Sequence, residues 1–116
     1  MSKKGFLLLF FIFLGFESLR AQQVNIDSLK NVIDNLGNDS NDIIKLNKLT
    51  TEYRLDNLDA ALLCATAAFE RSKSNPSKKL QVVSEYKLAL AYTDKNDFVQ
   101  SILHLTKVEK KSAAIN

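Results

Sequence analysis

The sequence predicts an all-α protein, and three observations lead to this prediction. Beyond residue 21, glycine and proline occur once each, as Gly37 and Pro76. Apolar residues return every three or four positions in five separate stretches, which is the spacing of one face of an α-helix. No stretch of useful length alternates apolar and polar residues, as a half-buried strand would. We therefore expect helices joined by short turns and no sheet.

The first 21 residues differ from the rest and predict an export signal. Lys3 and Lys4 precede the apolar run Gly5–Phe16, and Ala21 supplies a small residue for cleavage. A membrane-spanning helix is the rival interpretation, but the 12 residues of the run would span only about 18 Å of an apolar bilayer core of about 30 Å. We expect residues 1–21 to be a signal peptide and the protein to be periplasmic. Secretion, or retention at the inner membrane by an uncleaved signal, are the alternatives.

The charge of the chain gives no support for nucleic-acid binding. Residues 1–21 hold Lys3, Lys4 and Arg20 against Glu17. Of 16 basic and 13 acidic residues in the whole chain, 13 and 12 therefore lie beyond the signal. A nearly neutral domain lacks the basic face that nucleic acid requires. We expect contact with a membrane only through the signal segment, if that segment stays uncleaved.

Residues 22–41 are predicted to be a leading helix and a linker. The helix is expected over Asn25–Leu36, where one face carries Ile26, Leu29, Ile33 and Leu36. Asn25 or Asp27 can cap its start, and Gly37 suits the left-handed position that often follows a helix.

Residues 42–116 are predicted to form two helical hairpins. The four expected helices are Asp42–Arg54, Leu58–Ser74, Lys78–Thr93 and Asp97–Lys111. Pro76 separates the hairpins, because the residue before a proline is pushed out of the α region. Ala61, Ala65 and Ala68 lie on one side of the second of these helices, where small residues let another helix approach closely.

The two hairpins resemble each other. Tyr53 and Tyr92 are 39 residues apart, and Ala61 and Ser101 are 40 apart. The run A-Y-T-D-K-N-D-F-V-Q-S, starting at Ala91, resembles the turn of a tetratricopeptide repeat. The family's characteristic positions are matched by Leu49, Thr50 and Tyr53 in the first copy and by Leu88, Ala89 and Tyr92 in the second.

This resemblance implies a short α-solenoid of TPR-like helical hairpins, with two repeats, residues 43–75 and 82–115, behind one leading helix. Glu85 and Leu46 depart from the family pattern, which usually has tryptophan there. The run N-I-D-S-L-K at Asn25–Lys30, behind a signal peptide, also resembles the front of exported bacterial TPR proteins. In these, a TPR ectodomain is often joined to a sensor histidine kinase or a helix-turn-helix regulator.

The resemblance implies an exported scaffold that binds a protein or peptide partner, as the sensory front part of a signalling protein. Two alternatives remain open. The chain is a truncated or remnant TPR protein without independent function, because repeat arrays usually need three or more units. Alternatively, it is a small enzyme of unrecognised type.

A TPR array binds peptides in a groove lined by the first helix of each repeat. Carried onto this sequence, the candidate groove residues are Asn47, Thr51, Arg54, Tyr86, Leu90 and Thr93. The rival interpretation is that single members of this set only pack or face solvent. The lysine–asparagine clamp for a C-terminal carboxylate is not recognisable, since Asn47 stands where its first lysine would be.

Catalysis is not expected, and we assign no catalytic, cofactor-binding or metal-binding residue. Cys64 and His104 are the only residues of their kinds. Cys64 and His104 occupy equivalent positions in neighbouring repeats, and the packing distance between helices predicts that they lie about 10 Å apart. This is too far for the hydrogen bond that a nucleophile and its base require. Four zinc ligands are not available. We expect Cys64 to pack in the core and His104 to be partly exposed on its helix.

The last hairpin is expected to associate with a second copy of the chain. Phe98, Ile102, Leu105 and Val108 make its final helix apolar on more than one side. An uncovered solenoid end is poorly soluble. Fraying of this helix is the alternative outcome.

Overall fold

The computed structural model describes residues 25–115, and every regular element in this range is an α-helix. The five helices are α2 (Ile26–Asp34), α3 (Ser40–Tyr53), α4 (Leu58–Ser72), α5 (Lys78–Asp94) and α6 (Phe98–Ile115). The predicted all-α fold of repeated helical hairpins is confirmed. The predicted signal peptide lies outside the described residues. Between residues 25 and 115 no helix combines the length and apolar character needed to cross a membrane.

Polar residues set the start of each helix. The side chains of Asn25, Asp39, Asn57, Ser77 and Asp97 each accept a hydrogen bond from the backbone N–H three residues later. These bonds satisfy N–H groups that have no partner inside the helix. The short polar stretches that interrupt the apolar periodicity therefore determine where the chain turns.

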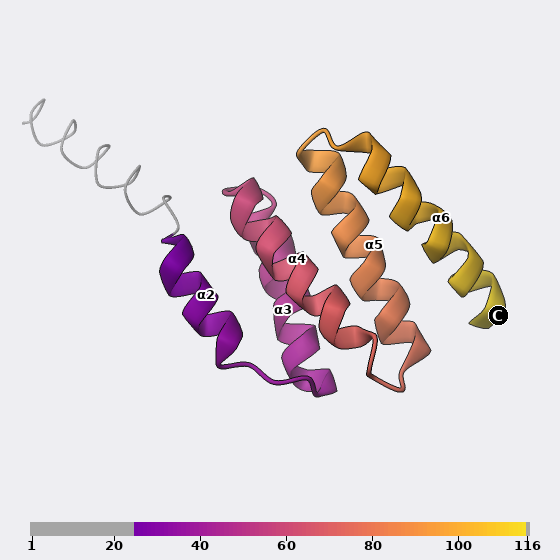
Figure 1. Ribbon diagram of the computed structural model, residues 1–116, viewed down its shortest axis with the longest axis horizontal. Coiled ribbons are helices and arrows are strands. Elements are labelled where there is room, and N and C mark those ends of the chain that lie inside the picture. The colour runs from indigo at the N-terminus through magenta and orange to yellow at the C-terminus, as the bar shows by residue number, and fades with distance from the viewer. Residues whose placement is uncertain (1–24, 116) are drawn as a thin grey trace, which may run out of the picture.

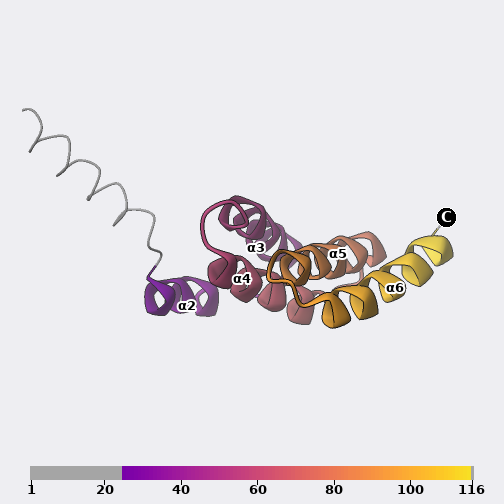
Figure 2. The ribbon, with the colours of Figure 1, turned by 90° about the horizontal axis from the view of Figure 1, so that it is seen from above.

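The helices form two layers. Figure 1 shows α3 behind α4, with α5 and α6 following as the second hairpin, and Figure 2 shows α3 and α5 on one side of the molecule with α2, α4 and α6 on the other. Helix α4 packs against α3 and α5, and α5 also packs against α6. The first helices of the two hairpins are thus neighbours in one layer.

The core lies along α4, whose alanines allow its neighbours to approach. Ala61, Ala65 and Ala68 have no exposed surface. One apolar cluster joins α2, α3 and α4 through Leu29, Ile33, Ile43, Leu46, Ala60, Cys64 and Ala68. A second joins α4 and α5 through Ala65, Phe69, Leu88 and Ala91. The predicted small-residue interface is therefore present on both sides of α4.

The left-handed backbone position is not where the sequence placed it. Among the described residues no glycine has a positive φ, so the prediction for Gly37 was wrong. Its N–H instead donates to Oδ2 of Asp42 at 2.7 Å, and a Cβ on Gly37 would lie 3.1 Å from the same oxygen. The left-handed residue is Asn96, with φ 62°. Asparagine tolerates this conformation because its short polar side chain can hydrogen-bond locally.

Two helix ends also differ from expectation. Helix α2 stops at Asp34 rather than Leu36, and Arg71 of α4 donates to the backbone carbonyl of Ile33 at 2.8 Å. Helix α6 continues to Ile115 rather than ending near Lys111. The ammonium of Lys111 reaches Glu85 on α5, so this lysine fixes the later part of α6 on α5.

Candidate peptide groove between α3 and α5

Polar side chains join α3 to α5 along their length. Three pairs are formed, Asn47 with Ser84, Thr51 with Lys87, and Arg54 with Asp94. The guanidinium of Arg54 makes two hydrogen bonds to the carboxylate of Asp94, a geometry that fixes the two helix ends relative to each other. These three pairs hold α3 and α5 side by side in one layer of the molecule.

A groove of about 550 Å³ lies between these two helices. Its walls are formed by Ile44, Asn47, Lys48, Thr51, Glu52, Leu80, Val83 and Lys87. Ile44 is 53% exposed, although it is a large aliphatic residue. The groove therefore combines an apolar wall with amide, hydroxyl and charged groups, a combination typical of ligand sites.

Asn47 is the unusual member of this wall. It is only 4% exposed, and its Nδ2 donates to Oγ of Ser84 at 3.0 Å. Its carbonyl oxygen Oδ1 is buried and accepts no hydrogen bond from the described residues. Leaving such an acceptor unpaired costs roughly 1–3 kcal/mol. A ligand N–H group can reach this buried oxygen only when the Asn47 amide turns toward the groove, and the bond would then recover that free energy.

The charges next to the groove are held in place by their neighbours. The hydrogen bond to Asp94 raises the pKa of Arg54 above its ordinary value, despite the opposing effect of partial burial. Burial, together with the nearby Arg54 charge, lowers the pKa of Lys87. Lys48 and Lys87 outnumber Glu52 in the groove wall, so the groove is weakly positive.

The structure brings some of the six predicted groove residues together and separates others. Asn47 and Thr51 line the groove. Arg54 lies at the end of α3, and its guanidinium already donates to the carboxylate of Asp94. Thr93 bonds to Ser101 of α6 and to its own helix, so its hydroxyl is directed toward α6 and not toward α3. Tyr86 is 46% exposed and Leu90 half-buried, and neither belongs to the groove wall.

Sequence reasoning missed the α5 side of the groove. Leu80, Val83, Ser84 and Lys87 follow one another at helical spacing on the face toward α3. The repeat offset of 39 residues does not find them, since Ser84 lies 37 residues after Asn47 and Lys87 lies 36 after Thr51. The available signal was the helical spacing of these four α5 residues.

A second polar cluster lies between α5 and α6. Glu85 is fully buried, and its carboxylate is bonded to Nδ1 of His104 and Nζ of Lys111, both at 2.7 Å. The ring of His104 stacks on Tyr92 with 5.7 Å between ring centroids, and the edge of Phe69 meets it at 5.3 Å. Burial raises the pKa of Glu85, but the hydrogen bonds from Lys111 and His104 outweigh it and lower the pKa below its usual value.

This cluster adds a contact that was not expected for His104. Its side chain keeps 12% exposure, as a partly exposed residue does, but it also fills a position between helices. Cys64 is fully buried as expected, and burial raises the pKa of its thiol to about 11. The thiol is therefore un-ionised at neutral pH, when it is a poor nucleophile. Residues 25–115 hold no group of three or more His, Cys, Asp or Glu side chains that could bind a metal ion.

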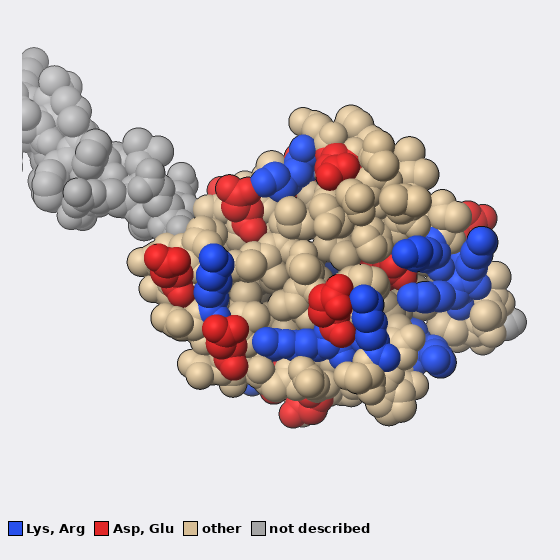
Figure 3. Space-filling view, in the orientation of Figure 1, with Lys and Arg blue, Asp and Glu red and all other residues tan. Residues whose placement is uncertain are grey.

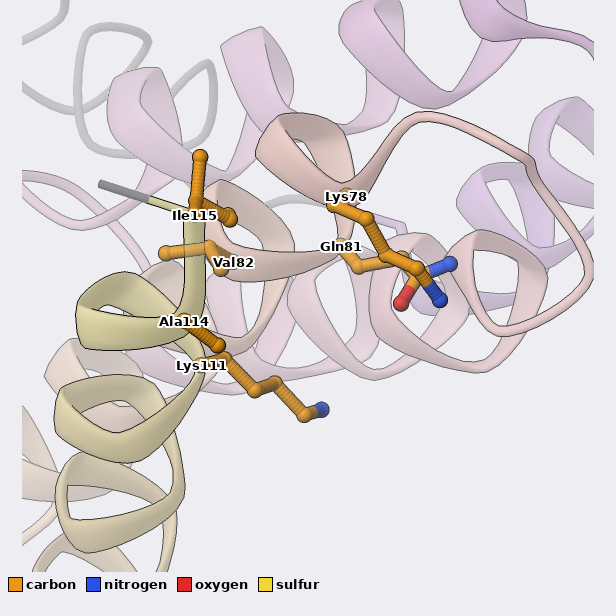
Figure 4. Close-up of a pocket in the computed structure, with 6 residues that line it drawn as sticks. All are labelled: Lys78, Gln81, Val82, Lys111, Ala114 and Ile115. Carbon is orange, nitrogen blue, oxygen red and sulfur yellow. The ribbon is translucent and has the colours of Figure 1, made fainter.

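A smaller pocket of about 310 Å³ lies between the start of α5 and the end of α6. Figure 4 shows Val82, Ala114 and Ile115 on one side of it, with Lys78 and Gln81 on the other. Two of its three polar side chains are already engaged, because Gln81 donates to the carbonyl of Asn75 and Lys111 to Glu85. The α3/α5 groove is therefore the better candidate site.

The fold and the groove define an all-α protein built from repeated helical hairpins, with a surface hollow between their first helices. No protein-family model, curated protein or solved structure matches the chain.

Proposed function

We propose that this protein is an exported scaffold of the tetratricopeptide type that binds an extended peptide segment of a partner protein in the α3/α5 groove. The observation that carries the proposal is the buried, unpaired Oδ1 of Asn47 in the groove wall. The apolar run Gly5–Phe16 behind two lysines supports export. The sequence similarity of the two hairpins supports the TPR relationship.

The chemistry of the groove favours a peptide over other ligands. The unpaired oxygen of Asn47, once its amide turns toward the groove, accepts an N–H donor, and an extended peptide presents one at every residue that is not proline. Ile44, Leu80 and Val83 offer a shallow apolar surface for a side chain of such a peptide. Lys48 and Lys87 favour an acidic side chain beside it. The expected ligand is an extended segment with an apolar and an acidic residue close together.

The role of the partner follows from the resemblance to exported TPR proteins. Some of these carry their repeats in front of a kinase or regulator, and a peptide bound in the groove would then be the signal that the protein senses. A sensory role for this chain is part of the proposal.

The test uses a library of random extended peptides, selected for binding to the full chain held in detergent. Selected peptides should combine apolar and acidic residues. Asn47→Ala should raise the dissociation constant of these peptides about tenfold, which corresponds to about 1.4 kcal/mol of binding free energy. Asn31→Ala is the matched control, because Asn31 is exposed on α2, away from the groove. The Asn31→Ala variant should bind the selected peptides with the same affinity as the unchanged chain.

A stability measurement separates binding from folding. Asn47→Ala removes a buried unpaired oxygen but leaves the buried Ser84 hydroxyl without its partner, so the free energy of unfolding should fall by about 1–3 kcal/mol. Binding is therefore compared under conditions in which urea unfolding shows both chains to be folded. Peptides that bind Asn47→Ala and the unchanged chain equally well would reject the groove. A selection that yields no binding peptide would also count against the proposal.

A further inference from the structure

Lys87 of α5 is a half-buried lysine without a carboxylate partner. It lines the α3/α5 groove. Among residues 25–115 no ion pair involves Lys87, whereas Arg54, the cation at the end of α3, is bonded to Asp94. A charge that is withdrawn from water costs free energy unless an opposite charge pairs with it. An anionic group placed in the groove would therefore lower the free energy of this lysine.

Hydrogen bonds to α3 hold the ammonium of Lys87 in place. Its Nζ donates to Oγ1 of Thr51, and the hydroxyl of Thr51 donates in turn to the carbonyl of Asn47 at 3.2 Å. Because a hydroxyl has one proton, Thr51 can only accept from the lysine. An ammonium has three N–H groups, so two remain for other acceptors. The groove thus presents a positioned cation with donors to spare.

The charges around Lys87 leave its positive charge unbalanced. Partial burial lowers the pKa of Lys87, and the charge of the nearby Arg54 lowers it further. At the exposed rim of the groove, Lys48 and Glu52 stand four positions apart on α3, a spacing at which opposite charges attract each other. Glu52 and Lys48 therefore largely balance each other, and the net charge of the groove wall lies at Lys87.

The opposite face of the molecule shows a different arrangement of charge. Figure 3 shows this face, where basic and acidic side chains lie next to each other over α2 and α4. Within α4, the ammonium of Lys73 lies 3.0 Å from the carboxylate of Glu70. Lysines also gather over the second half of α6, but Lys107 and Lys110 are exposed there and keep their hydration. Lys87 differs because it is both half-buried and unpaired.

The length of the groove sets the spacing of the residues that it can read. From Ile44 to Glu52 the groove follows α3 for about 12 Å, which is room for about four residues of an extended peptide. Its apolar wall is formed by Ile44, Leu80 and Val83, and Lys87 lies about 6 Å beyond Val83 along α5. In an extended chain, residues two positions apart point to the same side and are about 7 Å apart.

We propose that Lys87, positioned by Thr51, determines which peptides the groove accepts, by pairing with an aspartate or glutamate side chain that lies two positions from an apolar residue of the peptide. This inference rests on the proposed function, because it names the residue and the spacing that make the groove selective. Lys48 contributes less, since an ion pair at an exposed rim is weak.

Peptide selection on variants of the full chain tests the role of Lys87. A synthetic library with amidated C-termini is used, so that side chains supply the only carboxylates. The unchanged chain in detergent should select peptides with an acidic residue two positions from an apolar one. Lys87→Met should lose the enrichment of acidic residues, and Lys48→Met should reduce it less. Lys79→Met is the matched control, because Lys79 is exposed on the same helix outside the groove wall, and it should keep the enrichment.

Affinities of one selected peptide give an independent result. Replacing its acidic residue by the corresponding amide should raise the dissociation constant for the unchanged chain about three- to tenfold. The same replacement should have no effect on binding to Lys87→Met, whose folding is checked by circular dichroism. The first of these measurements changes only the peptide, so it tests the proposal even if Lys87→Met does not fold.

The outcomes separate this inference from the proposed function. Peptides that are selected with equal acidic enrichment by Lys87→Met and the unchanged chain would show that Lys87 does not select them, while the peptide groove itself would stand. Acidic residues at no fixed distance from an apolar one would contradict the spacing. Selection only from a parallel library with free C-termini would assign the carboxylate to the chain end and overturn the inference. A library that yields no binding peptide would reject the proposed function and this inference with it.

Discussion

The fully buried carboxylate of Glu85 on α5 bonds to Nδ1 of His104 on α6 at 2.7 Å. Its other oxygen bonds to Lys111, seven residues further along α6. Because the lowered pKa of Glu85 keeps the carboxylate ionised, it can only accept, and Nδ1 of His104 donates. Glu85 thus joins two successive turns of α6 to α5, beside the Thr93–Ser101 hydrogen bond and the stacking of Tyr92 on His104.

Acid should weaken this contact. The pKa of Glu85 is lower in the folded protein than in the unfolded chain, where it is about 4.3. Its contribution to stability is complete above the unfolded value and is lost as the pH falls through the folded value. Thermal melting followed by circular dichroism should therefore show a steeper loss of stability below about pH 4 for the unchanged chain than for Glu85→Gln. Parallel curves for the two proteins would contradict the assignment.

Removing Glu85 alone should be costly at neutral pH. Glu85→Ala leaves the mostly buried His104 without its acceptor and opens a cavity, so urea unfolding should show a loss of about 3 kcal/mol. Glu109→Ala, at an exposed position of α6, is the control and should change stability by less than about 0.5 kcal/mol.

Replacing the whole cluster by apolar residues should be far better tolerated. The triple variant Glu85→Leu, His104→Leu, Lys111→Met removes the buried charge together with both partners. Buried ionic groups exchanged for apolar residues of similar volume often leave stability unchanged or raise it. The triple variant should therefore be more stable than Glu85→Ala in the same urea experiment. A triple variant as unstable as Glu85→Ala would show that the ionic contacts themselves stabilise the docked α6.

Enlarging Ala65 should disrupt the α4/α5 contact. Ala65 has no exposed surface and packs with Phe69, Leu88 and Ala91. Ala65→Phe should lower the free energy of unfolding by about 1–3 kcal/mol through overpacking. Ala113→Phe makes the same change at an exposed position of α6 and should stay within about 0.5 kcal/mol. Similar melting temperatures for both variants would place Ala65 outside any tight interface.

Export should depend on the apolar run near the start of the chain. Arginine at both Leu8 and Phe11 should retain the protein in the cytoplasm, because each charge costs roughly 2.5–3.5 kcal/mol on a membrane-insertion scale. Cell fractionation of the unchanged chain and of the double variant measures this directly. Serine at the same two positions is the milder control and should reduce export less. Normal export of the arginine variant would remove the basis for a signal peptide.

The sequence by itself determined the helices and the turns between them. Apolar residues at helical spacing and polar residues such as Asn57, Ser77 and Asp97 act within a few positions of one another, so the sequence alone predicts where each helix lies. The alanines of α4 likewise predicted a close helix contact, since a small side chain permits it wherever the partner comes from.

The tertiary structure decided which side chains meet between helices. The bonds of Glu85 with Lys111 and of Asn47 with Ser84 join residues 26 and 37 positions apart, and they depend on how each helix is rotated about its axis. Helical periodicity constrains that rotation only loosely, because an apolar stripe is broad and polar residues border it on both sides. For this reason the contact of His104 with Glu85 and the α5 side of the groove were not foreseen. The direction in which Phe98 and Ile102 point was likewise fixed only when Lys111 and His104 docked the other side of α6 on a buried carboxylate.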